Sequence, residues 1–227
     1  MRISEKTVEL NFCKGFPLIL GRDLLWFGLT QKQEARAGFD ACAKAGSALL
    51  LFQLKASRIV LSDGSRRFLA EHQQMQILRN QVRSNRQVFY VLPTIGTTSE
   101  ICHGMCLSHC SRYLDVSRIP RVVPKPLAKG KSPPVVRRNG CHYMDMDASC
   151  SKVTIHSDPF TIDLVDASEM RELLGSFVQE KPQRQLQRTE QVGLQVGREP
   201  ESIGNFEEFW RELDGMDRKA LVGAYAT

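Results

Sequence analysis

The N-terminal segment combines apolar and polar side chains with the period of an α-helix. Val8, Phe12 and Phe16 fall on one face of this helix, and Ser4 precedes it in the position of an N-cap. Pro17 marks the expected end, because proline has no backbone N–H to donate. We therefore expect an amphipathic helix here that packs through its apolar face.

Two strands are expected next, at residues 36–44 and 48–55, joined by a turn at 45–47. The second strand contains an apolar run from Leu49 to Phe52. A short apolar run between turn residues and polar ends is typical of a buried strand. The pattern indicates a β-hairpin whose second strand lies in the core.

Three further elements complete the predicted core. Residues 66–83 keep helical apolar spacing and carry a polar opposite face, and residues 87–92 have the composition of a buried strand. Thr97 and Glu100 have capping-box spacing for a helix over 97–114. The order helix, hairpin, helix, strand, helix is typical of an α/β sandwich.

Composition changes after this core. Residues 118–138 hold five prolines, seven basic residues and no acidic residue, which predicts an extended, solvated segment. Beyond it we expect short strands at 152–157 and 160–165, a helix at 168–177, and a polar connection at 178–200.

The last apolar pattern has the i, i+3, i+4, i+7 spacing of a helix and consists of Phe206, Phe209, Trp210 and Leu213. We expect this helix to dock on its own domain or to bind a second copy or another protein. The expected organisation is an α/β core at 1–117, a basic linker at 118–138 and a small acidic α+β extension at 139–227.

Charge is distributed unevenly along this chain, whose formal net charge is +6. Residues 112–138 hold eight basic side chains and one acidic side chain, whereas residues 139–227 hold nine basic and 16 acidic side chains. A positive segment suits a polyanion such as a nucleic acid, and a negative segment would be repelled by it. A basic loop that is merely solvated is the alternative.

The early sequence shows neither an export signal nor a membrane span. The most apolar stretch there, residues 16–29, is broken by Arg22 and Asp23 and is too short to cross a bilayer. Without an export signal, the seven cysteines are expected to be thiols, because a reducing compartment disfavours disulfides. We therefore expect a cytoplasmic protein with no membrane partner.

The most informative residues for chemistry lie on the predicted hairpin. Gln53 and Lys55 point to the same face of a strand, whereas Leu54 points into the core. A hairpin brings Asp40, on the preceding strand, beside Gln53. Two oxygen donors beside a fixed ammonium are suited to hold Mg²⁺ against a phosphodiester and to stabilise charge on the phosphate.

This arrangement resembles the PD-(D/E)xK nuclease superfamily over about residues 5–110, and its Gln-x-Lys form resembles the branch of Mrr-like restriction endonucleases. The resemblance implies a restriction-endonuclease-like α/β sandwich and a Mg²⁺- or Mn²⁺-dependent enzyme that cleaves DNA in restriction or anti-phage defence. It implies catalytic roles for Glu9, Asp40, Gln53 and Lys55, with Glu9, Asp40 and Gln53 as metal ligands. Gln73 and Gln76 on the following helix would be auxiliary polar residues.

Two positions depart from the family pattern. Phe39 stands where the family has proline, and Gln53 replaces a carboxylate, which leaves one fewer negative charge to hold the cation. Glu9, Glu34 or the substrate phosphate would then complete the metal shell, although Glu34 also fits an ordinary surface turn. The alternative function is a catalytically inactive nuclease-fold subunit that binds nucleic acid or assembles with partner proteins.

Phosphate contact is the expected function of the basic segments, because they lack the interleaved aromatic residues on which bases stack. The expected nucleic-acid-binding residues are Arg58, Arg66, Arg67, Lys125, Lys129, Lys131, Arg137 and Arg138.

A second set of metal-type residues falls on the helix predicted over 97–114: Cys102, His103, Cys106, His109 and Cys110. Further ligands for such a site would be Cys141, His142 and Cys150. One helix rarely places four ligands tetrahedrally, so core packing of the cysteines is favoured and zinc is not expected. A zinc-stabilised interaction module is the alternative.

Overall fold

The fold is described from a computed structural model, in which residues 2–29, 31–45, 48–57, 59–101, 106–120, 140–156 and 160–177 are described. All of them lie within one compact unit, Met1–Gln179. None of the described helices is long and apolar enough to span a lipid bilayer.

The first of two sheets has the strand order β1-β2-β3-β6-β7. Its strands are β1 (Leu25–Gly28), β2 (Ala41–Ala45), β3 (Ala48–Leu54), β6 (Arg86–Pro93) and β7 (Ser111–Asp115). β3 pairs in parallel with β6, and the other pairs are antiparallel. Every residue of β3 is buried, which confirms the prediction of a hairpin with a core second strand.

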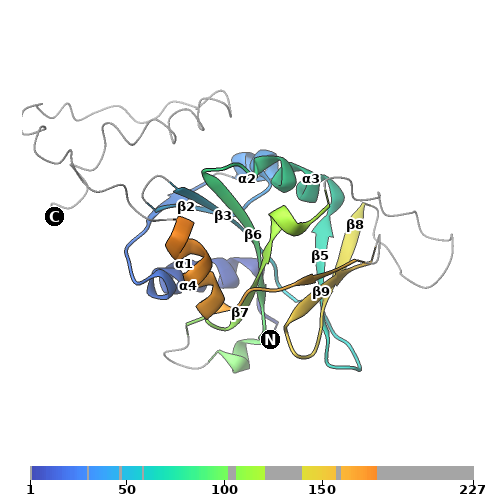
Figure 1. Cartoon of the computed structure of the whole chain (residues 1–227). Helices are drawn as coiled ribbons and strands as arrows, with labels where there is room; N and C mark the ends of the chain where they lie inside the picture. The colour runs from blue at the N-terminus through green and yellow to red at the C-terminus, as the bar shows by residue number, and fades with distance from the viewer. Residues whose placement is uncertain are drawn as a thin grey trace, which may run out of the picture. The chain divides into compact units, whose positions relative to one another are not determined.

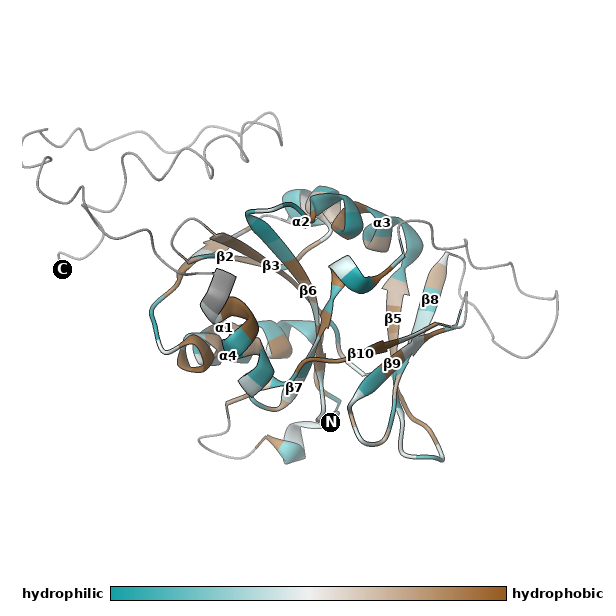
Figure 2. Ribbon diagram, viewed as in Figure 1, coloured by the Kyte–Doolittle hydropathy of each residue, from teal (hydrophilic) through white to brown (hydrophobic). Residues whose placement is uncertain are grey.

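Helices cover both faces of this sheet (Figure 1). They are α1 (Glu5–Leu20), α2 (Gln31–Ala37), α3 (His72–Gln81) and α4 (Ala167–Phe177), with short 3-10 turns η1 (Thr98–Glu100) and η2 (Val116–Arg118). α1 and α4 share one apolar core with the sheet, in which Phe12, Phe16 and Phe52 make edge or tilted ring contacts. α3 packs on β5 and β6 on the other side. The brown and teal stripes of α3 in Figure 2 match a helix with one buried and one solvated face.

The second sheet has the strand order β10-β9-β8-β5-β4. Its strands are β4 (Ile59–Val60), β5 (Arg66–Glu71), β8 (Cys141–Met146), β9 (Lys152–Ile155) and β10 (Phe160–Asp163). β5 pairs with β8 along its whole length, from Arg66↔Met146 to Glu71↔Cys141. Strands β8, β9 and β10, which come from the expected extension at 139–227, therefore belong to the same sheet as β4 and β5 of the expected core.

Three predicted elements differ from the structure. The helix expected over 66–83 is strand β5 followed by helix α3, because alternate residues Phe68 and Ala70 are buried with the period of a strand. The capping box at Thr97 and Glu100 is present, but it starts a single 3-10 turn, and the chain then enters β7. The strand expected over 36–44 is replaced by the end of α2 and the start of β2.

α1 also continues beyond the proline that was expected to end it. Ser4 caps the helix by accepting a hydrogen bond from the backbone N–H of Thr7, as predicted. Pro17 lies inside the helix, and Ile19 beyond it is still buried in the core. The end comes at Gly21, whose φ of 65° gives the left-handed conformation that glycine adopts at helix ends.

Candidate active site

Asp40 lies immediately before β2, at the open end of the β2–β3 hairpin. The pairing Ala41↔Phe52 and the hydrogen bond from the Asp40 N–H to the Phe52 carbonyl (2.9 Å) hold it against β3. The preceding Gly38 has φ of 77°, a conformation that β-carbon-bearing residues rarely adopt. The hairpin thus places Asp40 beside Gln53, as the sequence predicts.

One oxygen of Asp40 accepts two hydrogen bonds from β3. The Leu54 backbone N–H donates to Asp40 Oδ2 at 2.8 Å, and the Gln53 side-chain nitrogen Nε2 donates to the same atom at 2.7 Å. Gln53 is almost completely buried, so both of these hydrogen bonds are shielded from water on the Gln53 side. The carboxylate is therefore held by β3, the strand that carries Gln53.

Lys55 follows β3 and is also buried, with only 6% of its surface exposed. Its ammonium Nζ donates to Oε1 of Gln74 on α3 at 2.9 Å, and Gln74 Nε2 donates to Oε1 of Gln53 at 2.9 Å. These contacts confirm that Gln53 and Lys55 share a face of the strand. With Asp40 they form a continuous chain of hydrogen-bonded side chains.

Asp40 is held in an unfavourable environment for a charge. Burial raises the pKa of its carboxyl group from an ordinary 3.8 to about 6, against the lowering effects of the Leu54 N–H and the nearby Lys55 ammonium. The negative charge of Glu5, at the start of α1, raises the same pKa further. A perturbed carboxyl group beside a buried lysine is typical of a functional site.

Tyr90 contributes a second unusual group to this part of the sheet. It is opposite Gln53 in the parallel β3–β6 register and is completely buried, and its hydroxyl group has no hydrogen-bond partner. Burial raises the Tyr90 pKa, and the charges of Asp40 and Glu71 raise it further. A buried hydroxyl without a partner costs about 1–3 kcal/mol of stability.

Sequence reasoning missed four of these residues: Glu5, Glu71, Gln74 and Tyr90. The predicted auxiliary residues Gln73 and Gln76 are exposed, and Gln74 between them faces the site. The position at which α3 begins, His72, decides which of the three glutamines faces the site. The sequence pattern did not show this position, because it predicted a single helix over 66–83.

The predicted acids of the N-terminal part lie close to a lysine. Glu9 forms an ion pair with Lys6 at 2.7 Å on the surface of α1. The pKa of Lys6 is raised first by its hydrogen bond to Glu9 and then, more weakly, by the charges of Glu9, Glu34 and Asp40, with burial acting in the opposite direction. The charges of Glu9, Glu34 and Asp40 thus all act on Lys6. Among the described residues, no hydrogen bond joins Glu9 or Glu34 to Asp40.

The donor set fits a divalent cation in kind but not in orientation. Carboxylate and amide oxygens are hard ligands of the kind that Mg²⁺ prefers. However, the Gln53 amide presents its nitrogen to Asp40, and its oxygen accepts from Gln74. Within the described ranges, no group of three histidine, cysteine, aspartate or glutamate residues is arranged to hold a metal.

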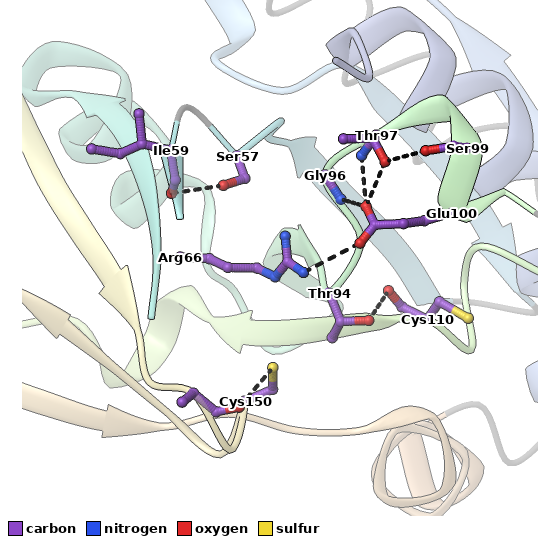
Figure 3. A network of polar contacts seen from close by, with 11 residues as sticks. Ser57, Ile59, Arg66, Thr94, Gly96, Thr97, Ser99, Glu100, Cys110 and Cys150 are labelled. Atoms are coloured by element: carbon purple, nitrogen blue, oxygen red, sulfur yellow. Dashed lines mark hydrogen bonds and ion pairs between the residues drawn. The ribbon is translucent and has the colours of Figure 1, made fainter. Parts of the chain in front are cut away.

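Two of the expected phosphate-contacting residues are engaged within the chain. Arg66 lies 3.6 Å from Glu100, whose other oxygen accepts from the Gly96 and Thr97 N–H groups (Figure 3). Arg67 makes a two-pronged ion pair with Asp145 and lies over the Tyr143 ring at 4.7 Å. The remaining expected contact residues, Arg58, Lys125, Lys129, Lys131, Arg137 and Arg138, lie outside the described residues.

The cysteine–histidine set does not lie on a helix where it is described. Residues 106–110 form a turn, in which Cys106 Sγ approaches the Gly15 carbonyl and the Ser108 hydroxyl and His109 is exposed. Cys102 and His103 lie outside the described residues, as does the stretch from Phe206 to Leu213. The helix predicted over 97–114 is therefore wrong at Cys106 and Cys110.

Comparison with protein-family models, with curated proteins and with solved structures finds no match to this chain.

Proposed function

We propose that the chain is a metal-dependent nuclease that hydrolyses phosphodiester bonds of DNA, with its active site at Asp40, Gln53 and Lys55. The observation that carries the proposal is their convergence on one face at the end of the hairpin. Asp40 contacts Gln53 at 2.7 Å, and Lys55 reaches Gln53 through Gln74 in two contacts of 2.9 Å. Buried polar residues linked in this way at the end of an apolar strand favour a function over packing.

Each residue has a chemical role in this proposal. Asp40 and the Gln53 side-chain oxygen would hold Mg²⁺ or Mn²⁺, and Glu5, Glu9 or Glu34 would supply further negative charge; of these, the charge of Glu5 acts on Asp40. The bound cation supplies charge stabilisation for the phosphoryl oxygen and lowers the pKa of a water molecule. Lys55, held in place by α3, would stabilise charge on the phosphate or orient the attacking water.

The order of elements supports the PD-(D/E)xK resemblance. Helix α1 precedes the β2–β3 hairpin, helix α3 follows it, and β6 then pairs in parallel with β3. Asp40 lies just before β2, and the Gln-x-Lys motif lies at the end of β3 and just beyond it, close to the strand positions that the resemblance expects for an acid and for this motif. DNA is the proposed substrate because the Mrr-like enzymes that this chain resembles cleave DNA. A role in restriction or anti-phage defence is proposed on the same ground.

The second candidate is a catalytically inactive subunit of the same fold that binds nucleic acid or protein partners. It is favoured by the replacement of a carboxylate by Gln53 and by the orientation of the Gln53 amide, which turns its nitrogen toward Asp40. An enzyme of this kind loses metal affinity when a negative ligand is removed.

Cleavage of supercoiled plasmid DNA in Mg²⁺ or Mn²⁺ separates the two candidates. The active-site variants are Asp40→Asn and Lys55→Met, and Gln73→Ala on the exposed face of α3 is the matched control. We expect the control to cleave at the native rate and each active-site variant to cleave at least about 10²-fold more slowly. Cleavage that both active-site substitutions leave unchanged contradicts the assignment, and DNA binding without any cleavage supports the inactive subunit.

A further inference from the structure

Positive charge accumulates at the C-terminal end of α3 and in the turn that follows it. From residue 72 to residue 99 the chain holds three arginines, Arg79, Arg83 and Arg86, and no aspartate or glutamate. The turn between α3 and β6 is closed by two backbone hydrogen bonds of 3.2 Å between Arg83 and Arg86. The helix therefore leads into a closed turn whose charges are all positive.

Two of these arginines differ from the arginines of β5 that the sequence suggested as phosphate contacts. The β5 arginines each lie within ion-pair distance of a carboxylate. Arg79 and Arg83 instead donate to backbone carbonyls, those of Ile119 and Val82, at 2.9 Å in both cases. Among the described residues, neither of them forms an ion pair. Their positive charge is therefore available to an external anion.

Exposed amide side chains lie beside these arginines. Gln76 and Asn80 are both exposed and lie one helical turn apart on α3. The large apolar side chains that are exposed in the described part of the chain come from α1, β1 and β4, and none comes from α3. Protein partners dock mainly through apolar and aromatic side chains, whereas arginines bind phosphates and amide side chains read base edges. This surface therefore suits a nucleic acid better than a protein.

We propose that the basic face of α3, which consists of Gln76, Arg79, Asn80 and Arg83, is a docking surface for duplex DNA. Arg79 and Arg83 contact phosphates, and Gln76 and Asn80 face the major groove. This groove admits an α-helix in B-form DNA but is too narrow for side chains to read in A-form RNA, which favours DNA. That the bound duplex is also the substrate rests on the proposed nuclease function, whereas the docking itself does not.

Binding of a short labelled DNA duplex to the full chain, measured by fluorescence anisotropy in EDTA, tests this surface in the absence of cleavage. The test variant carries Arg79→Gln and Arg83→Gln. The matched control carries Lys14→Gln and Arg22→Gln, which remove the same two charges from exposed positions on α1 and between α1 and β1. The net charge of the two variants is equal, so a difference between them reports the place of the charges.

We expect the α3 variant to bind DNA about tenfold more weakly than the control variant at the same salt concentration. Each lost phosphate contact should also reduce the slope of log affinity against log salt concentration by about 0.9, or about 1.8 for both arginines. Arg83→Gln alone keeps the contact of Arg79 with the Ile119 carbonyl and should reduce the slope by about 0.9. This single variant decides the matter if the double variant does not fold.

Three results overturn the docking surface. They are a native chain that does not bind the duplex, equal affinities and salt slopes of the α3 and control variants, and tighter binding of an RNA duplex of the same sequence.

The outcomes also separate this inference from the proposed function. If the α3 substitutions weaken DNA binding in EDTA but the native chain does not cleave DNA in Mg²⁺, the docking surface stands and the nuclease is rejected. If cleavage depends on Asp40 and the α3 variants bind DNA as the control does, the nuclease stands and the docking surface is rejected.

Discussion

Replacing Asp40 by asparagine is expected to stabilise the folded protein at neutral pH. Burial raises the pKa of the Asp40 carboxyl group from 3.8 to about 6, so the folded state favours the neutral form. Each tenfold change in proton affinity is worth about 1.4 kcal/mol, which gives roughly 3 kcal/mol for this group when it is fully ionised. Because Asp40 is partly exposed, we expect a gain of about 1–3 kcal/mol in the free energy of unfolding.

The sign of the pH dependence follows from the raised pKa. Between pH 3.8 and about 6 the folded state binds more protons at Asp40 than the unfolded state does, so the native protein loses stability as the pH rises through this window. Asparagine does not titrate. The stability difference between Asp40→Asn and the native chain should therefore be smallest below pH 4 and reach its full size above pH 6.

Urea unfolding followed by circular dichroism at pH 4, 5, 6 and 7.5 measures this difference. Asp23→Asn is the matched control, because Asp23 is exposed and lies between α1 and β1. We expect the control to track the native protein at every pH. An Asp40→Asn protein that is no more stable than native at pH 7.5, or whose advantage is the same at pH 4, would refute the buried-carboxylate reasoning.

Three further substitutions test other parts of the structure. Tyr90→Phe removes a buried hydroxyl without a partner and should raise the free energy of unfolding by about 1 kcal/mol, as measured by urea denaturation; a loss of stability would contradict the reasoning that the hydroxyl is unpartnered. Gly15→Ala should cost about 1–3 kcal/mol, because the added β-carbon would lie 2.4 Å from Cys106 Sγ, and an unchanged melting temperature would be the opposing result. Asp166→Ala should cost about 1 kcal/mol at pH 7 by removing the cap of α4. The hydrogen bond from the Glu169 N–H is the main cause of the lowered Asp166 pKa, so this cost should disappear as the pH falls below about 4; an equal cost at pH 3 speaks against the cap.

The hairpin and the pair Asp40–Gln53 were predictable from sequence because they depend on local rules. A strand alternates its side chains, so Gln53 and Lys55 had to share a face, and a short hairpin had to return Asp40 to the same end. The structure confirms both relations through the contacts of Gln53 with Asp40 and with Gln74. Local periodicity was sufficient wherever neighbouring elements pair with each other.

The contributions of Gln74 and Tyr90 were not predictable in the same way. Residues 66–71 fit helical spacing as well as strand alternation, and only their pairing with residues 141–146, far along the chain, selects the strand. That choice fixes where α3 begins and hence which glutamine faces the site. Tyr90 is surrounded by Phe89 and Val91 in an apolar strand, so nothing local distinguishes it from a core residue.

The proposed nuclease is tested most directly by the rate of Mg²⁺-dependent cleavage of plasmid DNA by Asp40→Asn, measured on protein whose stability has been confirmed to equal or exceed native. Folding cannot explain a loss of activity in such a variant. We predict a fully folded protein that cleaves at least about 10²-fold more slowly than native. Cleavage at the native rate by this variant would contradict a catalytic role for Asp40 and with it the proposed active site.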